Sequence, residues 1–353
     1  MTDKVLSLVR HPYFTTAQGG LELISLYNGF LKDMEPKVKA LSAAQILVAV
    51  SSGFANPLEG IAFLESKAAA LSKNDAQHQD SYCLLQTVIA AMFTTAGELE
   101  KAQLALATAK AAIDGAMGMD PVVVAQFHRA TALFHKARGV PDAGLFYRAG
   151  LLYLAYSAPD SISATERVNL ARDLALAGLV APDVYFLGEL LSHPIMVSLE
   201  SVPEQRWLVE LLHAFNSGNI ERWTALKTRH SAAMAALPAV ATNAERLEEK
   251  IAILALIELV WSHPADGRTL AFASIARATH SSNVELLVMR AMSLGLIVGD
   301  IDQVNSVVII ASVKARVLTL EQIEALRVRV GHWAVHVQQT QSAIEKQSEL
   351  IVC

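Results

Sequence analysis

Residues 268–312 read RTLAFASIARATHSSNVELLVMRAMSLGLIVGDIDQVNSVVIIAS, and this stretch decides the fold of the C-terminal third of the chain. The spacing of its apolar residues predicts a short strand over 268–272, helices over 273–279 and 283–294, and then a β-hairpin with β-branched residues on both arms. A long helix precedes the stretch. Helix, strand, helix, turn, helix and hairpin is the order of elements in a winged helix, so we predict a winged-helix module over 263–316.

The arms of the predicted hairpin carry few charges. We expect arms over 296–301 and 307–312, with the apolar run 307–310 opposite 296–298. Edge strands expose unpaired backbone groups, so they are natural surfaces for joining another protein. The residues predicted to form an interface on the hairpin are Leu296, Ile297, Val298, Val307, Val308, Ile309 and Ile310.

The charges of the winged helix do not suit nucleic acid. Its second helix carries one acid, Glu285, and one base, Arg290, and the wing adds Asp300 and Asp302. A helix that reads DNA needs Lys or Arg for phosphates and base edges. Together with a net charge of -5 over 353 residues, this pattern predicts no nucleic-acid partner and favours a module that binds protein.

Upstream of the winged helix the apolar periodicity is helical, and it repeats. Glycines recur between one apolar helix and the next at intervals of about 40 residues, a period typical of helical-hairpin solenoids. Glycine suits such turns because it adopts the left-handed conformation that ends a helix. The glycines that mark the repeat are Gly53, Gly97, Gly139, Gly178 and Gly218.

Signals at helix starts agree with this organisation. Asp120 before Pro121 predicts an N-cap followed by proline at the first helical position. Ser or Thr with Glu three residues later predicts a capping box. This spacing occurs at Ser163, Ser201, Thr242 and Ser282.

A long helix from Leu320 ends the chain, and its apolar residues fall every seven positions. Such a stripe is typical of a helix packed along other helices. For its first half, docking onto the winged helix of the same chain is the alternative. The stripe consists of Ile323, Val330, Val337, Ile344 and Ile351, with Leu326 and Trp333 interleaved.

These elements predict a mainly α protein in three parts. A helical-hairpin repeat solenoid forms an arm over 1–200. A second domain over 201–316 contains a helical part over 201–262 followed by the winged helix, and the C-terminal helix occupies 317–353. A chain of 353 residues exceeds the usual size of one domain.

The composition indicates that the protein is a subunit of a larger assembly. Hydrophobic residues make up 53% of the chain and charged residues only 18%, against about a quarter in an average soluble protein. The longest apolar stretch, 251–261, is interrupted by Glu258 and is too short to span a membrane. With two cysteines, Cys83 and Cys353, we expect a reducing compartment, cytoplasm or nucleus.

No residue pattern favours catalysis, a cofactor or a metal. The chain lacks phosphate-binding, nucleophile-elbow and zincin motifs. His332 and His336 lie four apart without a third ligand, so we expect them on a solvated helix face. His128 and His135 are interpreted as packing residues, and Cys83 as a small hydrophobe within an apolar helix. The sequence therefore predicts a protein that is not an enzyme.

Two stretches carry a resemblance to a known family: HPIMVSLESVPEQRWLVELLHAFNSGNIERWTALKTRH (193–230) and VELLVMRAMSLGLIVGDIDQV (284–304). Both closely resemble the PCI-domain lid subunits of the 26S proteasome. The likeness is clearest from about residue 180 to the end. Upstream, the chain resembles the family in the arrangement of its helices more than in residue identity. Its alanine-rich stretch 102–116 departs from the family.

The resemblance implies a scaffold role without catalytic activity. It implies that the winged helix joins the winged helices of other lid PCI subunits, and that the C-terminal helix enters a bundle with the metalloprotease-like lid subunits. It also implies a place near the ubiquitin-receptor subunit, with no nucleic acid and no membrane as partner. Two alternatives stay open: a scaffold of another PCI complex, such as the signalosome or translation initiation factor three, and a winged-helix protein that binds nucleic acid.

Overall fold

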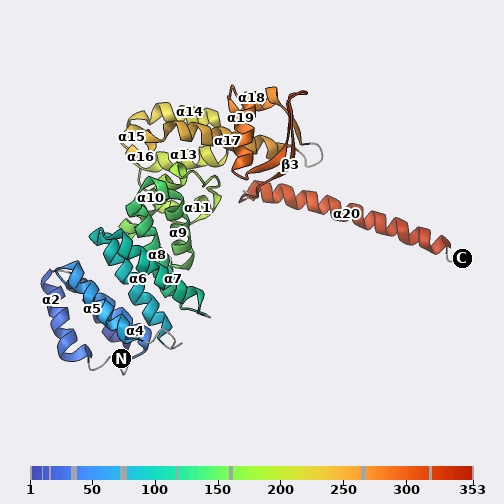
Figure 1. The fold of residues 1–353 in the computed structure, drawn as a ribbon. Coiled ribbons are helices and arrows are strands. Elements are labelled where there is room, and N and C mark those ends of the chain that lie inside the picture. Colours follow the sequence, from blue (N-terminus) through green and yellow to red (C-terminus); the bar gives the residue numbers. More distant parts are fainter. Residues whose placement is uncertain are drawn as a thin grey trace. The chain divides into compact units, whose positions relative to one another are not determined.

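The computed structural model describes residues 2–9, 11–15, 17–32, 38–71, 78–116, 118–158, 162–263, 268–317 and 320–351. It is mainly helical, as predicted (Figure 1). Contacts divide the chain into two compact units. The first comprises Met1–Tyr185, Pro194–Leu212 and Glu221–Lys250, and the second comprises Phe186–His193, His213–Ile220 and Ile251–Cys353. The predicted boundaries at 200, 262 and 316 stay predictions.

Helices that pack in succession make up most of the first unit. Helix α6 packs against α4, α5, α7 and α8, and α8 packs against α9, so apolar faces are buried between neighbours, as in a repeat array. The elements are α1 (Thr2–Val9), η1 (Pro12–Thr15), α2 (Ala17–Leu26), η2 (Tyr27–Leu31), α4 (Ala40–Ser51), α5 (Pro57–Ala70), α6 (Gln79–Ala96), α7 (Leu99–Asp114), α8 (Pro121–Arg138), η4 (Val140–Asp142), α9 (Ala143–Tyr156) and α10 (Ala164–Val180).

Shorter helices follow α10, and one long helix precedes the winged helix in the chain. Trp207 stacks on His230, which links α13 to the end of α14. The elements are α11 (Gly188–Ser192), α12 (Ile195–Glu200), α13 (Arg206–Asn216), α14 (Ile220–Arg229), α15 (Ser231–Ala235), α16 (Pro238–Thr242) and α17 (Ala244–Ser262).

Three of the five repeat glycines have a positive φ at a helix end, Gly97 (φ 83°), Gly139 (φ 85°) and Gly218 (φ 61°), and Gly97 has the predicted left-handed helical conformation. Gly53 follows the end of α4 without a positive φ, and its backbone lies against that of Gly20, where a Cβ would meet atoms 2.8 Å away. The prediction was wrong for Gly178. This glycine is buried inside α10, which continues to Val180.

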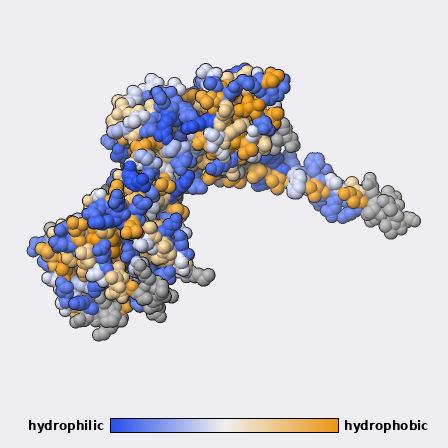
Figure 2. All heavy atoms as spheres, viewed as in Figure 1, coloured by the Kyte–Doolittle hydropathy of each residue, from blue (hydrophilic) through white to orange (hydrophobic). Residues whose placement is uncertain are grey.

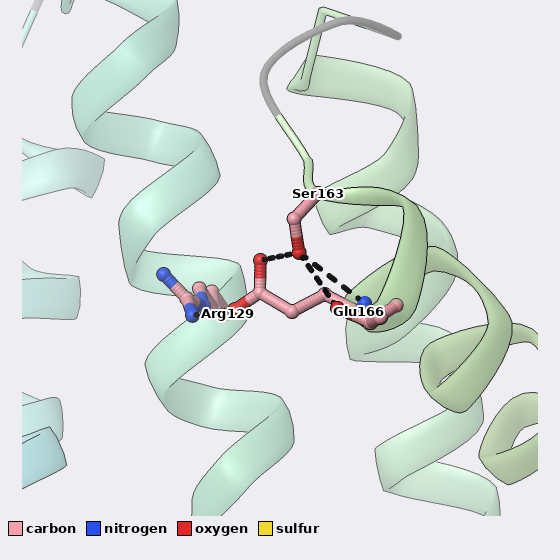
Figure 3. A network of polar contacts seen from close by, with 4 residues as sticks. Arg129, Ser163 and Glu166 are labelled. Carbon is pink, nitrogen blue, oxygen red and sulfur yellow. Dashed lines mark hydrogen bonds and ion pairs between the residues drawn. The ribbon is translucent and has the colours of Figure 1, made fainter. Parts of the chain in front are cut away.

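Two predicted helix starts are confirmed. The Asp120 carboxylate accepts a hydrogen bond from the N–H of Val122 (2.8 Å), and Pro121 is the first residue of α8. At α10, the Ser163 hydroxyl accepts from the N–H of Glu166 (3.3 Å) and donates to the carboxylate of Glu166 (3.0 Å). Figure 3 shows Glu166 reaching back to Ser163 and also towards Arg129 of α8.

The other three capping predictions were wrong. Ser201 follows α12, and the next helix begins only at Arg206. Thr242 is the last residue of α16. The cap of the winged-helix helix is Asn283, not Ser282, because the Asn283 side chain accepts from the N–H of Leu286 (3.1 Å).

Ion pairs link α8 to α10 in a regular way. Arg129 pairs with Glu166 at 3.3 Å, and Lys136 pairs with Asp173, so both pairs join residues 37 apart. Since the two pairs keep the same offset one heptad apart, α8 and α10 run parallel. In a helical-hairpin repeat, the first helices of successive hairpins are expected to run parallel, as α8 and α10 do.

The winged helix is confirmed in the order expected from the sequence. Its elements are β1 (Thr269–Ala271), α18 (Phe272–Thr279), α19 (Val284–Ser293), β2 (Ile297–Asp302) and β3 (Val307–Val313). Both strand pairs are antiparallel, and the strand order is β1-β3-β2. Its side-chain core includes Leu270, Ile275, Val288, Ala291, Ile297, Val308 and Ile310.

The C-terminal helix α20 runs over Leu320–Ile351 and has 32 residues. At about 1.5 Å per residue it is about 48 Å long. Thr319 with Gln322 three residues later has the spacing of a capping box and predicts the start of this helix, but Thr319 lies outside the residues that the structure describes.

Candidate interaction surfaces

The seven hairpin residues that the sequence singled out divide between the core and the surface. Leu296 (2% exposed), Ile297, Val308 and Ile310 are buried in the sheet's own core. Val307 is half-buried, and Val298 and Ile309 are exposed. The hairpin therefore offers Val298 and Ile309, rather than all seven side chains, to another protein.

The register of the hairpin differs from the prediction. The run 307–310 pairs with 299–302, and 297–298 lie opposite 312–313. A β-bulge between Val298 and Gly299 shifts the register there. The bulge lies beyond the 299–302 run as counted from the turn, so it does not cause the difference: the two arms pair directly outward from the turn, which places Val307 opposite Asp302.

The free edge of the sheet lies on a different strand from the one expected. Strand β3 is central, hydrogen-bonded to β1 and β2, so 307–310 form no edge. The longer edge strand is β2, and Val298 on it is 59% exposed. An edge strand retains unpaired N–H and C=O groups along one side. Strand β2 is therefore the longer strand with such unpaired groups.

The turn of the wing is ordered and ends in an apolar side chain. Asp302 accepts from the backbone N–H of Asn305 (3.0 Å) and from its side-chain amide (2.7 Å). Both hydrogen bonds hold the pKa of Asp302 below its usual value, and the bond from the backbone N–H has the larger effect. Val304 at the tip is 94% exposed, so a fixed turn presents it to its surroundings.

One apolar surface escaped the sequence analysis. On α19, Leu286 is 62% and Met289 57% exposed, while Val284, Leu287 and Val288 are buried. Helical periodicity alone would have found this pair, because residues three apart share a face opposite the buried positions. A side-chain hydrogen bond between Gln303 and Glu285 (3.4 Å) ties the wing to this helix.

Every described side chain of α20 is exposed. Trp333 is 66% and Ile344 61% exposed, and the remaining described members of the predicted stripe, Ile323, Val330 and Val337, are also exposed. The side chain of Ile351 lies outside the described residues. In Figure 2 orange, hydrophobic residues are interspersed with blue ones along this helix.

The apolar residues of α20 occupy two faces. Val328 and Val335 are exposed and seven residues apart, like the members of the stripe. Five residues separate Ile323 from Val328, which at about 100° per residue places them about 140° apart around the helix. A helix with apolar residues on opposite faces is suited to burial on more than one side.

The segment just before α20 is held within the second unit. The Arg316 guanidinium lies 2.6 Å from the Glu258 carboxylate on α17 and 5.8 Å from the Trp261 ring. The Val317 side chain lies against Gly188, where a Cβ would meet it at 2.8 Å. Arg316 and Val317 are therefore held by packing within the second unit.

The structure shows the surroundings of His135 and Cys83. His135 hydrogen-bonds Asp142 at 2.8 Å, and Arg138 pairs with the same carboxylate at 3.2 Å. The sequence treated His135 as a packing residue and missed this pair, which joins residues on either side of Gly139. Burial raises the pKa of the Cys83 thiol to about 11, so the thiol stays protonated at neutral pH.

Neither metal ligation nor membrane insertion has support in the part of the chain that the structure describes. No three His, Cys, Asp or Glu side chains there come close enough to hold a metal ion. His332 and His336 are exposed on α20. Among the same residues, each helix is too short or too polar to cross a bilayer.

Comparisons with known proteins agree along nearly the whole chain. A family model described as PSD13 N-terminal repeats matches residues 1–212. The 26S proteasome non-ATPase regulatory subunit 13 homolog B of Arabidopsis thaliana is 35% identical over 338 residues, which cover 95% of this chain and 87% of the relative. The 26S proteasome regulatory subunit RPN9 of Saccharomyces cerevisiae is 30% identical over 351 residues, 96% of this chain and 88% of the relative.

Proposed function

The chain belongs to the family of the 26S proteasome non-ATPase regulatory subunit 13, and from this premise we propose that it is a scaffold subunit in the lid of the proteasome regulatory particle. Its relatives carry names of regulatory, non-ATPase subunits. The proposal gives the chain no catalytic residue. Its work is to hold other subunits in place for ubiquitin-dependent protein degradation, in cytoplasm and nucleus.

The exposed apolar helix α20 is the observation that carries this proposal. Its large side chains, Trp333 and Ile344 among them, are exposed in the chain by itself. Burying such a side chain contributes about 1.5 to 3 kcal/mol before ordering costs. We propose that α20 gains this stabilisation in a helical bundle with the metalloprotease-like lid subunits.

The winged helix supplies a second proposed contact. Its surface near β2 and α19 is apolar at Val298, Leu286 and Met289, and the wing carries Asp300 and Asp302. This combination favours a protein partner over nucleic acid. We propose that the β2 edge joins the winged helix of a neighbouring PCI subunit, and that the chain lies near the ubiquitin-receptor subunit.

Truncation after Gln338 tests the role of α20. The shortened chain should keep its melting temperature, because the described side chains it loses are exposed. It should no longer enter the lid when the lid subunits are expressed together. The point variant Ile344→Glu should act in the same way, and Gln338→Glu is the matched control, a new charge on the same helix that should assemble normally.

Native mass spectrometry of the purified assemblies gives the readout. Normal incorporation of the truncated chain would show that α20 is no assembly element. A much lower melting temperature of the truncated chain alone would show that α20 packs within the subunit. Recovery of the full chain in the signalosome or in translation initiation factor three would reassign it to another PCI complex.

A further inference from the structure

The end of helix α10 leaves backbone carbonyls without helical donors. In an α-helix the N–H of each residue donates to the carbonyl four residues earlier. Four residues after Gly178 the chain has Pro182, which has no N–H. Proline also disfavours helical backbone in the residue before it, and Ala181 is extended (φ -60°, ψ 132°). The helix therefore ends at Val180.

These carbonyls lie in a buried part of the first unit. Gly178 is buried, and Leu179 and Ala181 are each 1% exposed. A buried carbonyl without a partner is costly, because water cannot replace the missing donor. The sequence around Pro182 thus creates a local requirement for hydrogen-bond donors.

Lys250 of α17 meets this requirement. Its side-chain amine donates to the carbonyl oxygens of Gly178 (2.6 Å), Leu179 (3.0 Å) and Ala181 (3.1 Å). An ammonium group has three N–H donors, which match these three acceptors. Lys250 is only 4% exposed, so the contacts are shielded from solvent.

We propose that Lys250 is the C-terminal cap of α10, supplied from a distant helix in place of the backbone N–H that Pro182 lacks. The cap joins α17 to α10 through hydrogen bonds rather than through an ion pair. Asp183, the acid that favours the charged form of Lys250, is itself paired with Arg148 at 2.7 Å. Direct contacts of Lys250 are to carbonyls and, at 5.4 Å, to the ring of Tyr185.

The protonation of the amine is compatible with this role. Burial lowers the pKa of Lys250 to about 7. The negative charge of Asp183 raises this pKa, and the positive charge of Arg246 lowers it. A neutral amine keeps two N–H donors and an ammonium group has three. In both forms the nitrogen donates to the end of α10.

The test compares four full-length variants by hydrogen exchange of the peptide spanning 174–185 and by thermal melting. Lys250→Met keeps the length of the side chain and removes its donors. We expect exchange in this peptide to rise about tenfold, as local opening of α10 would require. The matched control is Lys227→Met, which removes an exposed lysine paired with Glu248 and should leave the peptide unchanged.

Pro182→Ala distinguishes a cap from ordinary packing. The alanine of this variant has an N–H that can donate another helical hydrogen bond to Gly178, so Lys250→Met should have a clearly smaller effect in the Pro182→Ala background. If Lys250→Met does not fold, recovery of the fold in the double variant supports the cap. Equal effects in both backgrounds, equal failure to fold, or unchanged exchange in Lys250→Met would overturn the proposal.

Discussion

At the scale of single residues, Gly139 has the backbone conformation that other residues tolerate least. Its φ of 85° and ψ of -152° fall in a region populated almost only by glycine. A Cβ at this position would meet no atom within 4 Å. Any cost of a side chain here is therefore conformational, without a steric contribution from neighbours.

Gly139→Ala should lower the free energy of unfolding by about 1 to 3 kcal/mol. Chemical denaturation of the purified chain measures this. Gly331→Ala is the control: Gly331 lies in α20 without a positive φ or a close neighbour, and alanine is the better helix former there. Equal stability of Gly139→Ala and the parent chain would contradict the role of Gly139 as a helix-ending turn.

His128 gives the arm a pH dependence of known sign. Its ring stacks on Tyr156 at 5.8 Å, and burial lowers its pKa. The unfolded chain then binds a proton more readily than the folded chain, so stability is lost as the pH falls below about 6.5. His128→Phe retains a ring and removes the titration.

Denaturation at about pH 7.5 and about pH 5.5 should therefore show a larger loss of stability for the parent chain than for His128→Phe. The comparison of the two losses removes the contribution of other titrating groups. The interpretation fails if both chains lose the same free energy between these two conditions.

At the scale of elements, the hairpin combines core and surface positions in one strand pair. Val298 is exposed on the edge strand β2, whereas Val308 on the central strand β3 is fully buried. Val298→Glu should thus leave the melting temperature nearly unchanged and weaken the joining of a neighbouring lid subunit. Val308→Ala should lower the melting temperature.

Co-purification of lid subunits with each folded variant measures the joining. Normal recovery of partners by Val298→Glu would remove the β2 edge from the proposed interface. Val308→Ala is the control for stability: it shows how much a lower melting temperature by itself reduces the amount of lid subunits that co-purify.

The elements that the sequence predicted well have local causes. Gly97 and Gly139 end helices because tolerance of a positive φ is a property of glycine itself, and the Ser163 cap needs only the next turn of helix. The prediction that Gly178 ends a helix was wrong because glycine can also occur inside a helix, as it does in α10. What ends α10 is Pro182, four positions later.

At the scale of the whole molecule, the sequence indicated the architecture better than the surfaces. The spacing of glycines predicted a helical array, and the order of elements predicted a winged helix. Which strand is central, and which hairpin residues reach the surface, depend on pairing between residues far apart in the chain. The contacts of Lys250 with α10 also join residues far apart in the chain, so no local sequence pattern predicts them.

Synthesis of the chain puts those contacts in a temporal order. The carbonyl of Gly178 leaves the ribosome 72 residues before Lys250 does. At about 5 to 20 residues per second, the wait is about 4 to 14 s. Until α17 emerges, the end of α10 has only water as its donor, so the nascent arm cannot close over it. Completion of this part of the first unit therefore has to wait for α17, however early the helices before it form.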